Sequence, residues 1–127
     1  MRMLRIPVLL ALVLCTVSAF SANENYDGNE FLSKCSSAVK LLDNEKLSNS
    51  EMQDAEWCLG YVEGIADGIE IVSETSKSAR LYCMAEDVTT GQGVRVFVKW
   101  LRDHPEKLHN SGRILVVASF VNAFPCK

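Results

Sequence analysis

Apolar residues recur at intervals of three and four along most of the chain, which is the spacing of one buried face of an α-helix. The first such stretch can be capped by Asp27 or Asn29. Its apolar positions are Phe31, Leu32, Cys35, Ala38, Val39 and Leu42. The polar run 43–50 then predicts a loop. Ser50, followed three residues later by Gln53, resembles the capping box of a second helix.

The second helix is expected over residues 51–75, where the apolar stripe is the clearest in the chain. The stripe consists of Cys58, Val62, Ile65, Ile69 and Val72. Three glycines spaced four apart, Gly60, Gly64 and Gly68, lie beside it, and each costs a helix interior roughly 1 kcal/mol relative to alanine. We interpret them as a helix-packing groove that another helix of the same chain fills, with a second copy or a partner as the alternative. The carboxylates in the same stretch exclude the membrane form of this motif.

Two further helices are predicted after an irregular stretch, 73–90, that contains Cys83. Residues 94–101 alternate as a strand would and also fit a helical face. Helix is favoured because Thr89 or Thr90 can cap it, Pro105 can stop it, and no other segment alternates cleanly enough to pair with a strand.

Pro105 also suits the first turn of a fourth helix that ends before Pro125. The expected apolar face of this helix is Leu108, Ile114, Val117, Ala118, Val121 and Phe124. The whole pattern predicts an all-α fold, a small antiparallel bundle of four to five helices joined by short loops.

The start of the chain has the three-part pattern of a secretory signal peptide. Arg2 and Arg5 precede an apolar run over 6–19, and small residues lead to a cleavage site after Ala19. The run is shorter than the roughly 20 residues that span a bilayer, so no stable membrane anchor is expected. We expect residues 1–19 to be removed and residues 20–127 to form a single exported domain, which for a bacterial chain means the periplasm or the outside of the cell.

Two alternatives remain at this end of the chain. Cleavage after Ser21 or Ala22 would also fit the small residues there. Cys15 raises the alternative of a lipoprotein, which Leu14 disfavours because the lipidation motif needs a small residue at that position.

The chain of 127 residues has five cysteines, and removal of the signal peptide discards one of them. The four that remain are Cys35, Cys58, Cys83 and Cys126. An even number in an exported protein predicts two disulfides, for which sequence alone allows three pairings. The helix layout favours Cys35–Cys58, which are level in an antiparallel hairpin, and Cys83–Cys126, which flank the last two helices.

Composition and motifs argue against several classes of function. The net charge of −3 is small and of the wrong sign for a general nucleic-acid binder. The chain has no metalloprotease, phosphate-loop, Cys-x-x-Cys or Gly-x-Ser-x-Gly motif. His104 and His109 lie about 140° apart around a helix, so they do not converge on one metal. We therefore expect no enzyme activity, no cofactor and no metal, and a small exported binding or inhibitory protein.

Several ordered segments carry a family resemblance. They are GNEFL at 28–32 with Cys35, CLGYVEG at 58–64 with ADG at 66–68, Cys83, VT at 88–89 with GQ at 91–92, LRDHPE at 101–106, and AFPC at 123–126. Together they resemble the Rap/Tai family of type VI secretion amidase immunity proteins. The resemblance implies a periplasmic, all-helical, often dimeric protein. It also implies binding of a cognate peptidoglycan amidase effector and occlusion of its active-site groove, partly through a protruding loop.

The polar loops 73–80 and 103–110 are the candidate contacts with such a toxin. The second loop carries Asp103, His104, Glu106, Lys107, His109 and Asn110. Histidine and carboxylate there can meet a catalytic cysteine–histidine pair, whereas the alternative for each residue is a helix end with solvated charges. The competing hypotheses for the whole protein are a periplasmic acid-stress chaperone, a small-molecule carrier or enzyme, or another small secreted binding protein.

Overall fold

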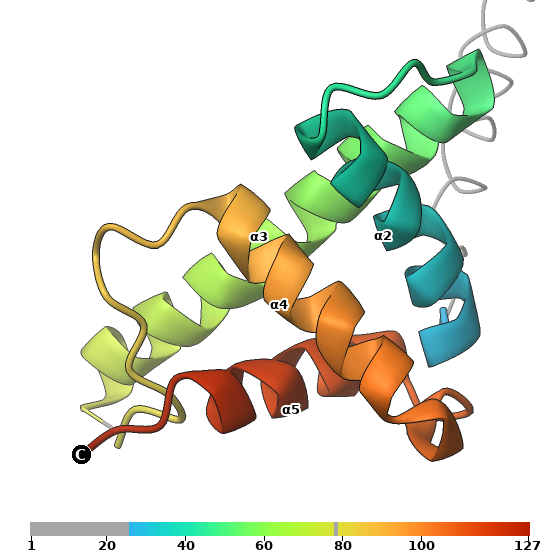
Figure 1. Ribbon diagram of the computed structural model, residues 1–127. Coiled ribbons are helices and arrows are strands. Elements are labelled where there is room, and N and C mark those ends of the chain that lie inside the picture. Colours follow the sequence, from blue (N-terminus) through green and yellow to red (C-terminus); the bar gives the residue numbers. More distant parts are fainter. Residues whose placement is uncertain (1–25, 78) are drawn as a thin grey trace, which may run out of the picture.

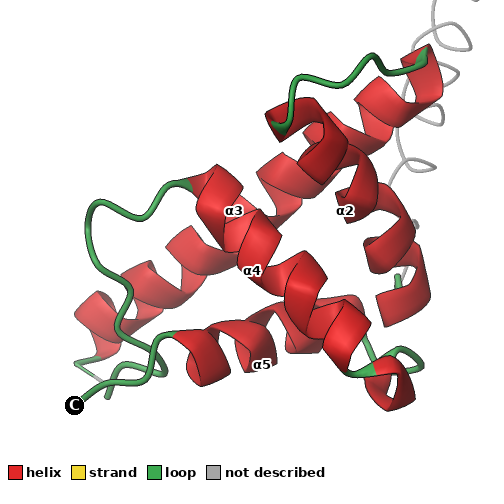
Figure 2. Ribbon diagram, in the orientation of Figure 1, coloured by secondary structure: helices red, strands yellow, loops and turns green. Residues whose placement is uncertain are grey.

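The computed structural model describes residues 26–77 and 79–127, and this part of the chain is helical (Figure 1). Four α-helices, α2 (Gly28–Leu42), α3 (Asn49–Ser76), α4 (Thr90–Asp103) and α5 (Gly112–Ala123), are joined by loops, with a short 3₁₀ helix, η1 (Pro105–Lys107), before α5 (Figure 2). No strand forms in the described residues. The all-α prediction is confirmed, whereas the expected signal peptide and Cys15 lie outside the described residues.

α2 and the first half of α3 form an antiparallel hairpin (Figure 1). The fully buried disulfide Cys35–Cys58 joins them, with a Cα–Cα distance of 5.2 Å. Ion pairs add to the contact along its edges, with Lys34 Nζ 2.6 Å from an oxygen of Asp54. This bridge and the second disulfide, Cys83–Cys126, are the pairing that the helix layout favoured.

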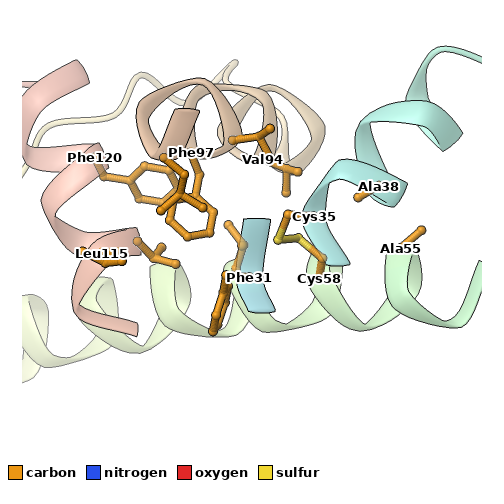
Figure 3. Close-up of a cluster of buried hydrophobic side chains, with 13 residues drawn as sticks. Phe31, Cys35, Ala38, Ala55, Cys58, Val94, Phe97, Leu115 and Phe120 are labelled. Carbon is orange, nitrogen blue, oxygen red and sulfur yellow. A yellow bond between two sulfur atoms is a disulfide. The ribbon is translucent and has the colours of Figure 1, made fainter. Parts of the chain in front are cut away.

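The core lies where α4 and α5 pack against this hairpin (Figure 3). Phe31 is at its centre, with its ring centroid 5.7 Å from that of Phe97 and 5.1 Å from that of Trp57. The fully buried apolar side chains are Phe31, Cys35, Ala38, Ala55, Cys58, Val94, Phe97, Leu101 and Val116. Burial of a large side chain stabilises a fold by roughly 1.5–3 kcal/mol, so these positions dominate the stability.

Capping boxes start three of the helices. α2 begins after Asp27 and α4 after Thr89, as expected. The expected box at Ser50 is wrong, because Ser48 caps α3 two residues earlier. Glu51 explains the difference, since its carboxylate accepts hydrogen bonds from the Ser48 backbone N–H at 2.9 Å and from Lys40 Nζ at 2.8 Å. Those bonds lower the pKa of Glu51 from 4.5 to about 2.

The expected fourth helix is wrong at its start. Pro105 opens only the single turn of η1, and α5 begins at Gly112. The chain between them is held by α2, since the N–H of Gly28 donates to Asn110 O at 3.0 Å and the N–H of Gly112 donates to Tyr26 O at 2.8 Å. Gly112 is required here, because a Cβ would lie 2.0 Å from the Phe31 ring.

The buried face of α5 also differs from the expected one. It consists of Gly112, Leu115, Val116, Ser119 and Phe120. Ile114 is instead 61% exposed and Val121 is 42% exposed. Because α5 is apolar on nearly every side, periodicity alone cannot choose the face that packs on α4.

Candidate functional site

The second half of α3 extends beyond the core (Figure 1). The buried residues of α3 are Ala55, Cys58 and Val62, all in its first half. Beyond Val62 the apolar stripe continues through Ile65 and Ile69, which are partly buried, to Val72, which is 59% exposed. The neighbouring Ile71 is 60% exposed. Large apolar side chains left uncovered at the end of a long helix make this half of α3 a candidate surface for a partner.

The three glycines of α3 face open space. Apart from the adjacent backbone of α3 itself and the two neighbouring residues in the chain, no described atom lies within 4 Å of the Cβ that would be added at Gly60, Gly64 or Gly68. The expectation that another helix of the same chain packs on them is therefore wrong. The other helices contact α3 on the side of Cys58 and Val62, which leaves the glycine side uncovered.

An apolar groove lies between the second half of α3, α5 and the loop that follows α3. This hollow is called the apolar groove below. Its volume is about 570 Å³. Its lining residues are Gly64, Ile65, Gly68, Ile69, Val72, Ser73, Ala79, Leu81, Arg113, Ile114 and Val117. Several of them, Val72, Leu81 and Ile114, are among the exposed large apolar side chains of the described chain. Because Gly64 and Gly68 have no side chains, the groove extends close to the backbone of α3.

A second hollow, of about 350 Å³, lies on another side of the same half of α3, and we call it the acidic cleft. Its apolar lining includes Val62, Ala66, Met84, Val88 and Phe120. Its carboxylates are Glu63, Asp67, Glu70, Glu74 and Glu86, with Arg80 as a cation among them. Burial, and then the nearby carboxylates of Glu70 and Asp67, raise the pKa of Tyr82 beside this cleft. The cleft thus combines an apolar floor with a negatively charged rim.

The loop 77–89, of which the structure describes all residues except Ser78, connects α3 to α4 (Figure 2). Described residues of this loop line both hollows. Lys77, in a left-handed conformation with φ of 52°, ends α3. The loop is fixed near its middle, because Cys83 forms a disulfide with Cys126 and its N–H donates to Phe124 O at 2.8 Å. The Tyr82 ring also packs edge-on against Phe120, at 5.4 Å between centroids.

The loop 103–110 lies at the opposite end of α4 from the loop 77–89 (Figure 1). Several side chains of this loop are engaged in contacts within the chain. Asp103 pairs with Lys99 at 2.5 Å, and the His104 ring stacks on Trp100 at 4.3 Å between centroids. The Asn110 side chain donates to Lys107 O at 2.9 Å.

The exposed charges of the loop 103–110 include Glu106 and Lys107, with His109 exposed beside them. They do not line either hollow. Among the residues that the structure describes, no group of His, Cys, Asp or Glu is arranged to hold a metal ion. The same residues contain no helix that is long and apolar enough to cross a membrane.

These features define a small disulfide-stabilised helical protein with an uncovered apolar surface and an uncovered acidic surface. Residues 27–126 match the family model of the Rap1a immunity proteins, and the chain therefore belongs to that family. The resemblance to Rap/Tai immunity proteins is thereby confirmed. No curated protein and no solved structure matches the chain.

Membership suggests a role in immunity against a type VI effector, carried out by binding that effector as a non-enzymatic inhibitor. Together with the disulfides it also suggests an exported protein.

The acidic cleft was not predicted from the sequence, although a signal for it was present. Glu63, Asp67, Glu70 and Glu74 are spaced four, three and four apart, which places them on one side of a helix. The apolar groove gave no such signal, because it depends on how α5 packs beside α3.

Proposed function

We propose that this protein is a periplasmic immunity protein that binds a peptidoglycan amidase effector of type VI secretion and occludes its active site. Family membership supports the immunity role. The observation that carries the proposal is the second half of α3 with the loop 77–89, where the chain leaves both an apolar and a charged surface uncovered. Inhibition of this kind needs no turnover, because an inserted loop excludes substrate and water from the groove of the amidase.

The loop 77–89 and the acidic cleft are the proposed contact with the effector. A loop that is pinned at Cys83 loses less conformational entropy on binding than a free loop. The carboxylates beside it favour a basic surface on the partner and increase the association rate at low salt. The loop 103–110 is the competing contact, since Glu106, Lys107 and His109 are exposed there.

Periplasmic co-expression tests the function and separates the two loops. A candidate amidase, chosen from the genes that neighbour the gene for this chain, is expressed in the periplasm with the full chain, and lysis is followed by culture density. The matched variants are Glu86→Arg in the acidic cleft and Glu106→Arg in the loop 103–110, since both residues are exposed. We expect the wild-type chain and Glu106→Arg to prevent lysis, and Glu86→Arg to protect less.

Each other outcome of this experiment has a definite meaning. Loss of protection in Glu106→Arg alone would move the contact to the loop 103–110. Lysis that proceeds equally with and without the wild-type chain would refute the immunity function for that amidase.

We also propose that a second copy of the chain covers the apolar groove. Gly64 and Gly68 have no side chains that would fill the groove on the α3 side, and Ile114 of α5 also lines the groove. In a two-fold symmetric pair the same patch is used on both subunits, so Ile114 of one copy can insert into the groove of the other. Arg113 is the single charged residue that lines the groove, so few charges would be desolvated.

Three glycine substitutions on one helix test the dimer. Gly64→Leu and Gly68→Leu fill the groove, whereas Gly60→Leu is the control, because Gly60 also faces open space but does not line the groove. We expect light scattering to give the mass of two chains for the wild type and Gly60→Leu, and that of one chain for the other two variants. A wild-type chain that is monomeric at every concentration would contradict the proposal.

A further inference from the structure

The two disulfides lie in opposite environments. Cys35 and Cys58 are completely buried between α2 and α3 (Figure 3). Cys83 and Cys126 are both exposed, and they join the loop 77–89 to the segment that follows α5. Thiol–disulfide exchange requires a thiolate to reach a sulfur of the bridge. Only the second bridge offers such access in the folded protein.

The exposed bridge fixes a loop that has no regular secondary structure. The neighbouring attachments are the hydrogen bond from the Cys83 N–H to Phe124 O and the contact of Tyr82 with Phe120. Phe124 lies in the same segment after α5 as Cys126, so loss of the bridge frees both partners of that hydrogen bond to move apart. Neither cysteine of this bridge belongs to the buried core, whereas Cys35 and Cys58 do.

The loop contributes residues on both sides of the bridge. Leu81, two residues before Cys83, lines the apolar groove, and Met84 and Glu86, just after it, line the acidic cleft. The end of the chain lies beside this loop and the last turns of α3 (Figure 1). One covalent bond thus holds residues of both hollows in place.

We propose that Cys83–Cys126 is a redox-sensitive latch, whose reduction releases the loop 77–89 and weakens binding while the helical core stays folded. The binding part of this inference rests on the proposed function. In the reaction, one thiolate of an external dithiol attacks a sulfur of the bridge, forms a mixed disulfide and releases the other cysteine as a thiolate. The second thiol of the reagent then displaces the remaining cysteine. The reagent is oxidised to a cyclic disulfide, and two electrons and two protons convert the bridge into two thiols.

Native reduction tests the latch without any partner. The protein is titrated with dithiothreitol, alkylated and mapped by mass spectrometry, and hydrogen exchange is recorded on the same samples. We expect Cys83 and Cys126 to be labelled at concentrations that leave Cys35 and Cys58 unlabelled. We also expect exchange to accelerate at least tenfold in the loop 77–89 and to stay unchanged in α2. Joint reduction of both bridges, or unchanged exchange in the loop, would overturn the proposal.

Binding to the candidate amidase of the co-expression experiment is measured on the same samples. The oxidised chain is expected to bind at least tenfold more tightly than the reduced chain, and the double variant Cys83→Ser/Cys126→Ser should bind like the reduced chain with or without dithiothreitol. Equal affinity of both forms would overturn the functional role of the latch. No binding of the oxidised chain, combined with selective reduction, would instead refute the proposed function and leave the latch intact.

Discussion

The two halves of α3 have similar apolar patterns and different surroundings. In the first half, Ala55, Cys58 and Val62 are buried against the rest of the chain. In the second half, the same pattern continues to Val72, which is largely exposed like the neighbouring Ile71, and the adjacent Gly64 and Gly68 face open space. Since the chain itself does not cover these residues, the second half suits intermolecular contact and the first half suits folding.

The disulfides follow the same division. The buried bridge Cys35–Cys58 lies in the first half of α3 and belongs to the core. The exposed bridge Cys83–Cys126 holds the loop that lies beside the second half. A covalent bond of the same kind therefore stabilises the fold in one region and positions a candidate binding surface in the other.

The same substitution at two positions of α3 gives the largest expected contrast. Val62→Asp places an unpaired carboxylate in the core, at a cost of several kcal/mol, and we expect it to abolish cooperative unfolding. Val72→Asp lies on the exposed stripe and should change the free energy of unfolding by less than about 0.5 kcal/mol in the monomer. Urea denaturation followed by circular dichroism checks both. Comparable destabilisation by the two variants would remove the distinction between the halves.

Charge reversal in the two halves of α3 is expected to have different effects on the rate of association with the amidase. We expect Asp67→Lys with Glu70→Lys to lower the association rate with the amidase about tenfold at low salt, because the acidic cleft steers a basic partner. Glu56→Lys, an exposed residue in the first half, is the matched control and should change the rate little. Surface interferometry at low and high salt measures both variants. The rates should converge at high salt, where charges are screened, and equal rates at low salt would argue against the acidic cleft.

Alanine at the control glycine is expected to have a smaller, favourable effect. Gly60→Ala should raise the free energy of unfolding by about 0.5–1 kcal/mol, because helix propensity improves and the new Cβ meets no described atom within 4 Å. Gly112→Ala is the contrasting variant, since its Cβ would clash with Phe31. Thermal unfolding measures both changes. A destabilised Gly60→Ala would mean that this face of α3 is packed after all.

The smallest expected effect concerns the cap of α3. The folded-state pKa of Glu51, about 2, lies below its ordinary value of 4.5, so its stabilisation is fully present above that ordinary value and is lost as the pH falls through the folded value. Melting temperatures between pH 5 and pH 2 should therefore fall less steeply for Glu51→Gln than for the wild type. Glu45→Gln, an exposed residue in the preceding loop, serves as the control. Parallel curves for Glu51→Gln and the wild type would contradict this assignment.

The sequence predicted the helices wherever local signals agreed. Spacing and caps placed α2 and α4, and the level positions of Cys35 and Cys58 in a hairpin favoured the observed bridge. The start of α5 was missed because a tertiary contact decides it, namely the close approach of Gly112 to Phe31. No local pattern encodes a contact between residues so far apart in the chain.

The candidate site was predictable only in part. The loop after α3 was marked by its irregular composition and Cys83, but its relation to α5 and to the carboxylates of α3 depends on packing. The glycines were recognised as a groove, and their partner was assigned to the wrong place. That assignment required the position of α5, whose apolar surface extends over nearly all its sides.

Hydrogen exchange of the chain with and without the candidate amidase of the co-expression experiment tests the central claim most directly. If the loop 77–89 and the acidic side of the second half of α3 bind the effector, exchange there should slow at least tenfold in the complex. The first half of α3, which packs in the core through Ala55, Cys58 and Val62, should not change. Protection confined to the loop 103–110, or a complex that leaves 63–89 unprotected, would contradict the account.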